Sequence, residues 1–257
     1  MNSKKWLALT ALCSLVLLLA LVGCSKKEEA PSEAPAAPAA KATPIDPATV
    51  ATVTGTIKFE GAAPKPRKID MSQDPACSGG MGLTETVVSE GGNLANVFVY
   101  VKDGLGDRSF DIPNAPATID QHGCHYVPHV LGVMTGQTIE ILNSDPTTHN
   151  IHPSPKNNKE WNESQAPKGT PLEKVFAREE IMLPVKCNQH PWMKMYVSVV
   201  KNPFFSVSAK DGKFSITGLP PGKYTIAAVH ETLGEQIMQV EVGPKESKTA
   251  DFSFKVQ

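Results

Sequence analysis

The stretch Cys187-Asn-Gln-His190-Pro-Trp-Met193 places a thiol, an imidazole and a thioether close together in the chain. His149 offers a second imidazole upstream. Two histidines and a cysteine with a weak axial methionine suit copper, because soft sulfur favours Cu(I) and imidazole binds both oxidation states. The stretch therefore predicts one type 1 copper ion, held by these side chains: His149, Cys187, His190 and Met193.

The residues around these ligands resemble the cupredoxin family. The segment Gly136-Gln-Thr-Ile-Glu-Ile-Leu-Asn143 is similar to the cupredoxin strand that ends in Asn just before the first ligand, and Thr148-His149-Asn150-Ile151-His152 follows it. The spacing Cys-x-x-His-x-x-Met is similar to the short ligand loop of amicyanin within that family. The resemblance covers residues 126–200 and implies a Greek-key β-sandwich in which His149 is the first copper ligand.

The ligand set leaves alternatives open. Met193 fits the amicyanin spacing and is favoured as the axial ligand, whereas Met195 fits the longer plastocyanin-like spacing. Cys187 also has a plainer interpretation as a buried core thiol or half of a disulfide, and His149 as a surface histidine. His152 would point to the opposite face of an extended segment from His149, so we leave it out of the ligand set.

The resemblance also implies roles for the neighbours of the ligands. Asn150 is expected to tie the two ligand loops together, since groups around a metal site orient its ligands. The edge of His190, beside Trp192, is expected to be exposed in an apolar patch where a redox partner docks. Pro184, in the strand before the cysteine, can lie only at a sheet edge or a bulge.

The C-terminal tail resembles a second family. Asp211-Gly212 predicts a turn between strands, and Pro220-Pro221-Gly222-Lys-Tyr224 follows it. These residues are similar to the carboxypeptidase regulatory-like (transthyretin-like) β-sandwich. Such modules often open with segments like Gly55-Thr-Ile and Ala95-Asn-Val, so the copper segment is expected to be inserted into this sandwich.

Short runs of Val, Ile, Thr and Phe, separated by turn residues, predict an all-β fold of the sandwich or barrel type. The predicted strands are 53–59, 97–101, 138–142, 196–200, 213–216, 224–229 and 236–242. We therefore expect a cupredoxin Greek-key β-sandwich together with a transthyretin-like β-sandwich. The expected divisions are a signal peptide (1–23), a lipidated cysteine with an Ala/Pro-rich tether (24–50), N-terminal strands of the regulatory-like sandwich (51–118), the copper domain (119–201) and the remaining sandwich strands (202–257).

The N-terminus resembles a bacterial lipoprotein signal peptide. Lys4 and Lys5 precede an apolar run over 6–22, and the run ends in Leu21-Val22-Gly23-Cys24. The resemblance implies cleavage before Cys24, lipid on its sulfur and anchoring to a membrane outside the cytoplasm. Ser25 favours the outer membrane over the inner one, and an uncleaved transmembrane anchor is the alternative.

Cys13 is expected to leave with the signal peptide and Cys24 to carry lipid. Three cysteines then remain in an oxidising compartment, and they are Cys77, Cys124 and Cys187. The economical arrangement joins Cys77 to Cys124 in a disulfide and leaves Cys187 as the metal-bound thiolate, since a free exposed thiol is prone to oxidation. A second cluster lies around Cys124, and its histidines offer a hypothetical second copper or zinc site: His122, His125 and His129. The plainer interpretation is a structural disulfide flanked by ordinary histidines.

The balance of charged side chains and the number of predicted copper ligands argue against two classes of function, nucleic-acid binding and catalysis. The chain has 25 basic and 26 acidic side chains, so nothing indicates nucleic-acid binding. A complete set of four ligands leaves no open position for a substrate, so we do not expect an enzyme. The leading hypothesis is a membrane-anchored carrier of single electrons, with a c-type cytochrome or a respiratory enzyme as its partner. The alternatives are a copper carrier or storage lipoprotein and a metal-free β-sandwich binding module.

Overall fold

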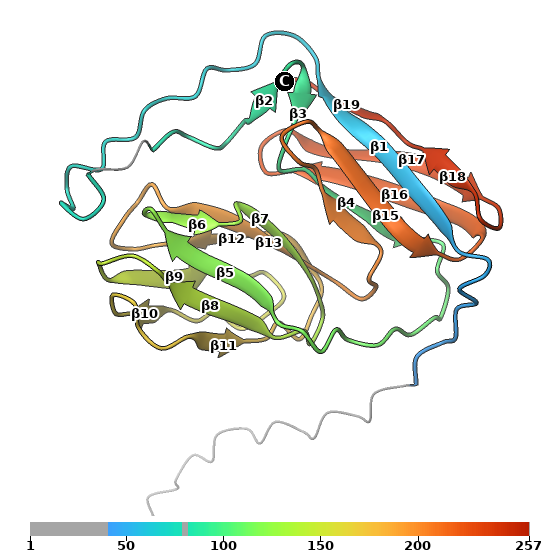
Figure 1. The fold of residues 1–257 in the computed structure, drawn as a ribbon, viewed down its shortest axis with the longest axis horizontal. Coiled ribbons are helices and arrows are strands. Elements are labelled where there is room, and N and C mark those ends of the chain that lie inside the picture. The colour runs from blue at the N-terminus through green and yellow to red at the C-terminus, as the bar shows by residue number, and fades with distance from the viewer. Residues whose placement is uncertain (1–40, 79–81, 257) are drawn as a thin grey trace, which may run out of the picture. The chain divides into compact units, whose positions relative to one another are not determined.

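The computed structural model describes residues 41–78 and 82–256, and this part of the chain contains strands and no helix (Figure 1). The all-β prediction is therefore confirmed, and each of the seven predicted strands is present. Within the same residues, no helical segment has the length and hydropathy that a membrane span needs. The predicted signal peptide (1–23) and the lipidation site Cys24 lie outside the described residues.

The first sandwich is built from two separate parts of the chain, and we call it the discontinuous sandwich. One sheet contains β1 (Ala51–Phe59), β2 (Ser89–Glu90), β3 (Asn93–Leu94), β15 (Lys213–Leu219), β18 (Ser247–Thr249) and β19 (Phe252–Phe254). The other sheet contains β4 (Phe98–Asp103), β14 (Phe205–Val207), β16 (Gly222–His230) and β17 (Gly234–Val242). Figure 1 shows blue β1 lying among the orange and red C-terminal strands.

Strand β1 holds the two parts of this sandwich together. It pairs antiparallel with β15 and parallel with β18 and β19. Its residues alternate between buried and more exposed positions, the period of two that a strand with one core face requires. Gly55 lies so close to the neighbouring backbone that an added Cβ would be 2.1 Å from the Ala250 carbonyl oxygen. The strands of the discontinuous sandwich therefore come from before and after residues 117–200 in the sequence.

The turn motif of the tail has a clear physical role. Gly212 has a φ of +73°, which glycine adopts at low cost in the turn before β15. The Tyr224 hydroxyl donates a hydrogen bond of 2.7 Å to the Pro220 carbonyl and fixes the entry into β16. These residues explain the turn without establishing the regulatory-like family, which remains a prediction.

The second sandwich is formed by consecutive strands and is called the inserted sandwich. One sheet contains β7 (Val130–Met134), β9 (His149–Pro153), β10 (Glu163–Gln165), β12 (Glu180–Lys186) and β13 (Lys194–Val200). The other contains β5 (Ala117–His122), β6 (His125–Val127), β8 (Ile139–Asn143) and β11 (Leu172–Lys174). Its core is rich in isoleucine, valine and sulfur-containing side chains.

Pro184 lies inside β12, next to an irregular part of that strand. The pairing of β12 with β13 shifts register between Glu180 and Leu183, and Met182 has a φ of +51° at this bulge. The pairing of β12 with β9 includes only Val185 and Lys186, so the missing N–H of Pro184 costs no ladder bond to β9. Pro184 therefore lies directly after the bulge, opposite Tyr196 of β13, and its carbonyl accepts the Ser154 N–H at 2.9 Å.

The segment 69–78, which we call the covering segment, links the two sandwiches in an unexpected way. Met71 and Cys77 are buried in the core of the inserted sandwich, although they come from the region 51–118. Cys77 is joined to Cys124 by the predicted disulfide. The predicted 51–118 region therefore contributes to both cores. The predicted tether also contacts the folded part of the chain. Its last residues pack on the discontinuous sandwich, and the Thr43 N–H donates to the Ser109 carbonyl.

Candidate metal centre

The Cys187 stretch forms a tight loop between β12 and β13. The Met193 N–H donates to the His190 carbonyl at 2.9 Å, and the Cys187 N–H donates to the Met193 carbonyl at 3.2 Å. These two bonds close the loop on itself, so the side chains of Cys187 and His190 face the same point. Local sequence spacing is enough to bring these two donors together.

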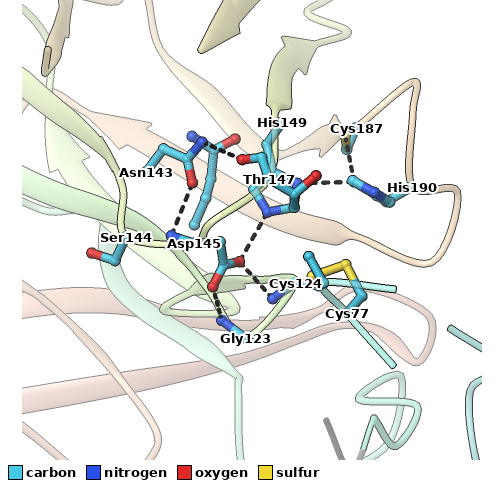
Figure 2. Close-up of polar contacts among 12 residues, drawn as sticks. Cys77, Gly123, Cys124, Asn143, Ser144, Asp145, Thr147, His149, Cys187 and His190 are labelled. Atoms are coloured by element: carbon cyan, nitrogen blue, oxygen red, sulfur yellow. Dashed lines mark hydrogen bonds and ion pairs between the residues drawn. A yellow bond between two sulfur atoms is a disulfide. The ribbon is translucent and has the colours of Figure 1, made fainter. Parts of the chain in front are cut away.

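His149 opens β9 and meets the loop from the neighbouring strand. Its Nδ1 lies 2.8 Å from Nδ1 of His190, and the latter lies 3.7 Å from Sγ of Cys187 (Figure 2). The three donor atoms all lie within 4.8 Å of one another. The side chains are buried, with 0%, 4% and 2% exposure for His149, His190 and Cys187. The predicted ligands from two distant segments therefore converge.

The protonation pattern of the two rings suits a cation. Nε2 of His149 lies 2.9 Å from Asp145 Oδ2, and Nε2 of His190 lies 3.0 Å from Asp74 Oδ2. A carboxylate can only accept, so each Nε2 carries a proton, and an Nδ1 without a proton directs a lone pair toward the other ring. Two lone pairs at 2.8 Å repel each other unless a shared proton or a metal ion lies between them. The residues present therefore fit a metal.

Burial affects the charge of the first histidine. Desolvation lowers the pKa of His149, against the opposing hydrogen bond to Asp145. The neutral ring is therefore favoured, and the neutral imidazole is the form that binds metals. Sγ of the buried Cys187 is the sulfur donor, and within the described residues this is the one cysteine outside a disulfide.

Asn150 ties the two ligand segments together, as the sequence predicts. Its backbone N–H points at Sγ of Cys187 at 3.5 Å, and its side-chain Oδ1 lies 3.2 Å from the same sulfur. That oxygen also accepts the Asn188 N–H at 2.6 Å. Asn150 therefore fixes the cysteine relative to β9.

The axial position is not decided by the structure. Met193 lies in the loop and Met195 at the start of β13, and both side chains are fully buried in the same core as Cys187. Met193 as the fourth ligand therefore stays a prediction. His152 lies away from the three donors, because its ring contacts Asn188 at 3.1 Å and Glu160 at 2.6 Å.

The prediction of an exposed His190 edge is wrong. The ring is 4% exposed, and Asp74 of the covering segment accepts a hydrogen bond from the nitrogen that the prediction left facing solvent. Trp192 is partly exposed instead, with its ring centroid 5.1 Å from that of His190. The covering segment comes from far upstream in the chain, so no local signal near His190 indicated it.

Asp74 and Asp145 are residues of the candidate site that sequence reasoning missed. Asp145 precedes His149 by four residues, and this spacing in a turn is a signal that could have found it. Asp74 lies 116 residues from His190, and nothing in its neighbourhood points to a metal site. Both carboxylates contact the outer nitrogen of a candidate ligand.

The histidines of the second cluster, His122, His125 and His129, do not meet at one point as the three donors of the candidate centre do. The rings of His125 and His129 face Glu85, at 3.5 Å and 3.6 Å between nitrogen and oxygen, and His122 is exposed. His129 also pairs with Glu231 at 3.1 Å. Across residues 41–78 and 82–256, the groups of ligands that converge on one point include none of these histidines. A second metal site stays an untested hypothesis.

Comparison with known proteins gives limited similarity. No family model and no curated protein matches the chain. A copper-containing nitrite reductase from Thermus scotoductus SA-01 is 20% identical over 38% of this chain and 25% of that chain, with a TM-score of 0.32. The chain thus spans about a quarter of that reductase. A purple cupredoxin from Nitrosopumilus maritimus is 27% identical over 32% and 98%, with a TM-score of 0.28. An amicyanin variant in its Cu(I) state is 17% identical over 38% and 96%, with a TM-score of 0.30.

Proposed function

We propose that this chain is a blue-copper protein of the cupredoxin type that carries single electrons between redox partners. The observation that carries the proposal is the buried convergence of Nδ1 of His149, Nδ1 of His190 and Sγ of Cys187. Two imidazoles and one thiolate form the trigonal set that suits copper in both oxidation states. Met193 is the proposed axial ligand.

The chain's residues hold this donor set rigidly. When bound, copper supplies a couple that gains or loses one electron. Asn150 holds the sulfur and the Cys187 loop closes on itself, so the donors have little freedom to move. A site that is already ordered before the metal arrives limits structural change when its charge changes.

The cellular setting is part of the proposal. We place the chain outside the cytoplasm, anchored by lipid on Cys24, because the N-terminal sequence resembles a lipoprotein signal. The partner class is a c-type cytochrome or another respiratory redox protein. A brief encounter over a small interface suits such a carrier. An enzymatic role is not proposed, since four ligands leave no coordination position for a substrate.

A second candidate function is the carriage or storage of copper. The observation that favours it is the buried His190 edge, because the covering segment closes the side from which an electron would be expected to leave. A carrier needs release of its metal more than an exposed electron route. Rapid transfer of Cu(I) to a chelator would support this function over electron transfer.

The test uses visible absorption and EPR spectra of the full chain after loading with Cu(II). We expect an intense thiolate-to-copper band and a narrow copper hyperfine splitting, because the sulfur donates strongly to the metal. Cys187→Ser should abolish the band completely. His152→Gln is the matched control, since His152 lies next to the site without facing it, and its spectrum should equal that of the original chain. A colourless loaded protein would contradict the proposal.

A further inference from the structure

Both candidate histidine ligands are backed by a carboxylate in the same way. Asp145 accepts from Nε2 of His149 and Asp74 accepts from Nε2 of His190, while the two Nδ1 atoms face each other. We propose that Asp74 and Asp145 are a matched pair of positioning residues that orient both imidazoles toward the copper. The pair stabilises Cu(II) more than Cu(I), and the Cys77–Cys124 disulfide holds the pair in place. This inference rests on the proposed blue-copper function.

Asp145 is itself fixed in one orientation. Its Oδ1 accepts the Gly123 N–H at 2.7 Å, and its Oδ2 accepts the Cys124 N–H at 2.7 Å as well as Nε2–H of His149 (Figure 2). The Asp145 N–H donates to Oδ1 of Asn143 at 3.1 Å. A buried carboxylate that accepts from three donors is held in one position. The ring of His149 therefore has one favoured orientation.

Asp74 is held by the opposite segment. Its Oδ2 accepts from the Thr147 hydroxyl at 2.7 Å and from Nε2–H of His190 at 3.0 Å, and its Oδ1 accepts the Ala76 N–H at 2.8 Å. These three contacts fix the carboxylate of Asp74 against the ring of His190. The covering segment thus brings a negative charge to a ring that lies far away in sequence.

The disulfide joins the two supports directly. The Cys77 N–H donates to the Asp74 carbonyl, and the Cys124 N–H donates to the side chain of Asp145. The sulfur of Cys77 lies within 4.8 Å of a His190 nitrogen, and that of Cys124 within 4.8 Å of a His149 nitrogen. The disulfide therefore joins the covering segment, which contains Asp74, to the turn at Cys124, which holds Asp145. The hydrogen bond from Thr147 to Asp74 is a second link between these segments.

The chemical consequence concerns the preference between oxidation states. A carboxylate that accepts from the outer nitrogen of a ligand histidine fixes the tautomer and makes the inner nitrogen a stronger donor. A stronger nitrogen donor stabilises Cu(II) more than Cu(I), because Cu(I) favours soft sulfur. Two such carboxylates act in the same direction, so they lower the reduction potential of the bound metal.

The test compares three variants of the full chain: Asp74→Asn, Asp145→Asn and the control Asp70→Asn. Asp70 is an exposed residue of the covering segment whose carboxylate contacts a backbone N–H and no histidine. We expect each of the first two variants to lose about 10- to 100-fold in Cu(II) affinity, with a smaller loss for Cu(I) and a higher reduction potential. The control should keep both affinities and the potential.

A second measurement is independent of copper. Nitrogen NMR of the metal-free chain reports which ring nitrogen carries the proton, and Asp74→Asn should change this pattern for His190, whereas Asp70→Asn should leave it unchanged. Folded variants whose potential and ring protonation equal those of Asp70→Asn would overturn the positioning role. If the original chain forms no thiolate-to-copper band, the proposed function fails by itself, and the NMR comparison still decides whether the carboxylates position the rings.

Discussion

The two sandwiches bury different kinds of side chain. Within the described residues, the discontinuous sandwich has an apolar core with several phenylalanines, and few polar residues such as Ser208 and His230 are buried in it. The inserted sandwich buries a polar network at one end, which includes Gln121, Asn143 and Gln165 as well as the residues of the candidate centre. These amides bond to one another and to backbone carbonyls.

The difference separates stability from function. Apolar burial stabilises a sandwich directly, whereas a buried polar network is tolerated only when its members are hydrogen-bonded and adds little net stability. We infer that packing alone stabilises the discontinuous sandwich and that the inserted sandwich gains additional stability from its disulfide. Two of the predictions below, on the disulfide and on a pair of leucines, test this inference directly. The third concerns His230, a buried polar side chain in the apolar core of the discontinuous sandwich.

The largest expected effect follows removal of the disulfide by Cys77→Ser with Cys124→Ser. The bond closes a loop with a sequence separation of 47, so its loss should lower the free energy of unfolding of the inserted sandwich by about 4 kcal/mol. Tryptophan fluorescence during urea unfolding measures this, because Trp161 and Trp192 both pack on the inserted core.

The discontinuous sandwich provides the internal control for that prediction. The two described tryptophans lie outside it, so far-UV circular dichroism reveals its unfolding as a separate transition. An equal shift of both transitions would mean that the two sandwiches unfold as one unit, and the comparison would then lose its basis.

The next effect comes from a matched pair of leucines, Leu94 in the discontinuous core and Leu183 in the inserted core. Both are buried, with 0% and 1% exposure, so each Leu→Ala change should cost about 3 kcal/mol in its own sandwich. Added copper should restore stability after Leu183→Ala and leave Leu94→Ala unimproved, because a ligand stabilises only the unit that binds it. Urea unfolding with and without copper measures both, and equal rescue by copper would contradict the separation.

The smallest effect concerns pH and the discontinuous sandwich. Burial lowers the pKa of His230 to about 4, below the ordinary value of 6.5. Because the unfolded chain binds the proton first, stability is complete above pH 6.5 and is lost as the pH falls toward 4, with a loss of about 2 kcal/mol at pH 5. His230→Gln should remove this loss.

His122→Gln is the control for the pH experiment, since His122 is exposed. Unfolding curves recorded by circular dichroism between pH 7 and pH 5 measure the difference. If His230→Gln and the original chain lose the same stability over this range, the buried histidine is not the cause.

The parts of the molecule that depend on local sequence could be predicted. The strands follow from short runs of Val, Ile, Thr and Phe between turn residues. Cys187 and His190 are brought together by a short loop that the residue spacing alone describes. The role of Asn150 was predicted from the family resemblance, because this residue follows His149 directly. The Cys77–Cys124 disulfide followed from counting the cysteines of an oxidising compartment.

The parts that depend on distant contacts could not be predicted. The sequence around Asp74 has no feature that distinguishes it from other acidic residues, and only the tertiary fold brings it to His190. The burial of the His190 edge was missed for the same reason. The family resemblance suggested an exposed edge, because it covers residues 126–200 and does not include the covering segment.

The pairing of β1 with the C-terminal strands has a consequence for the order of events during synthesis. Thr56 N–H donates to a carboxylate oxygen of Asp251, 195 residues later, and β1 has its parallel partners only in β18 and β19. Contacts so far apart in sequence form slowly and only after the intervening chain exists. The discontinuous sandwich therefore begins first in the sequence and is completed last in time, while the inserted sandwich has all its strands before β15 has been made.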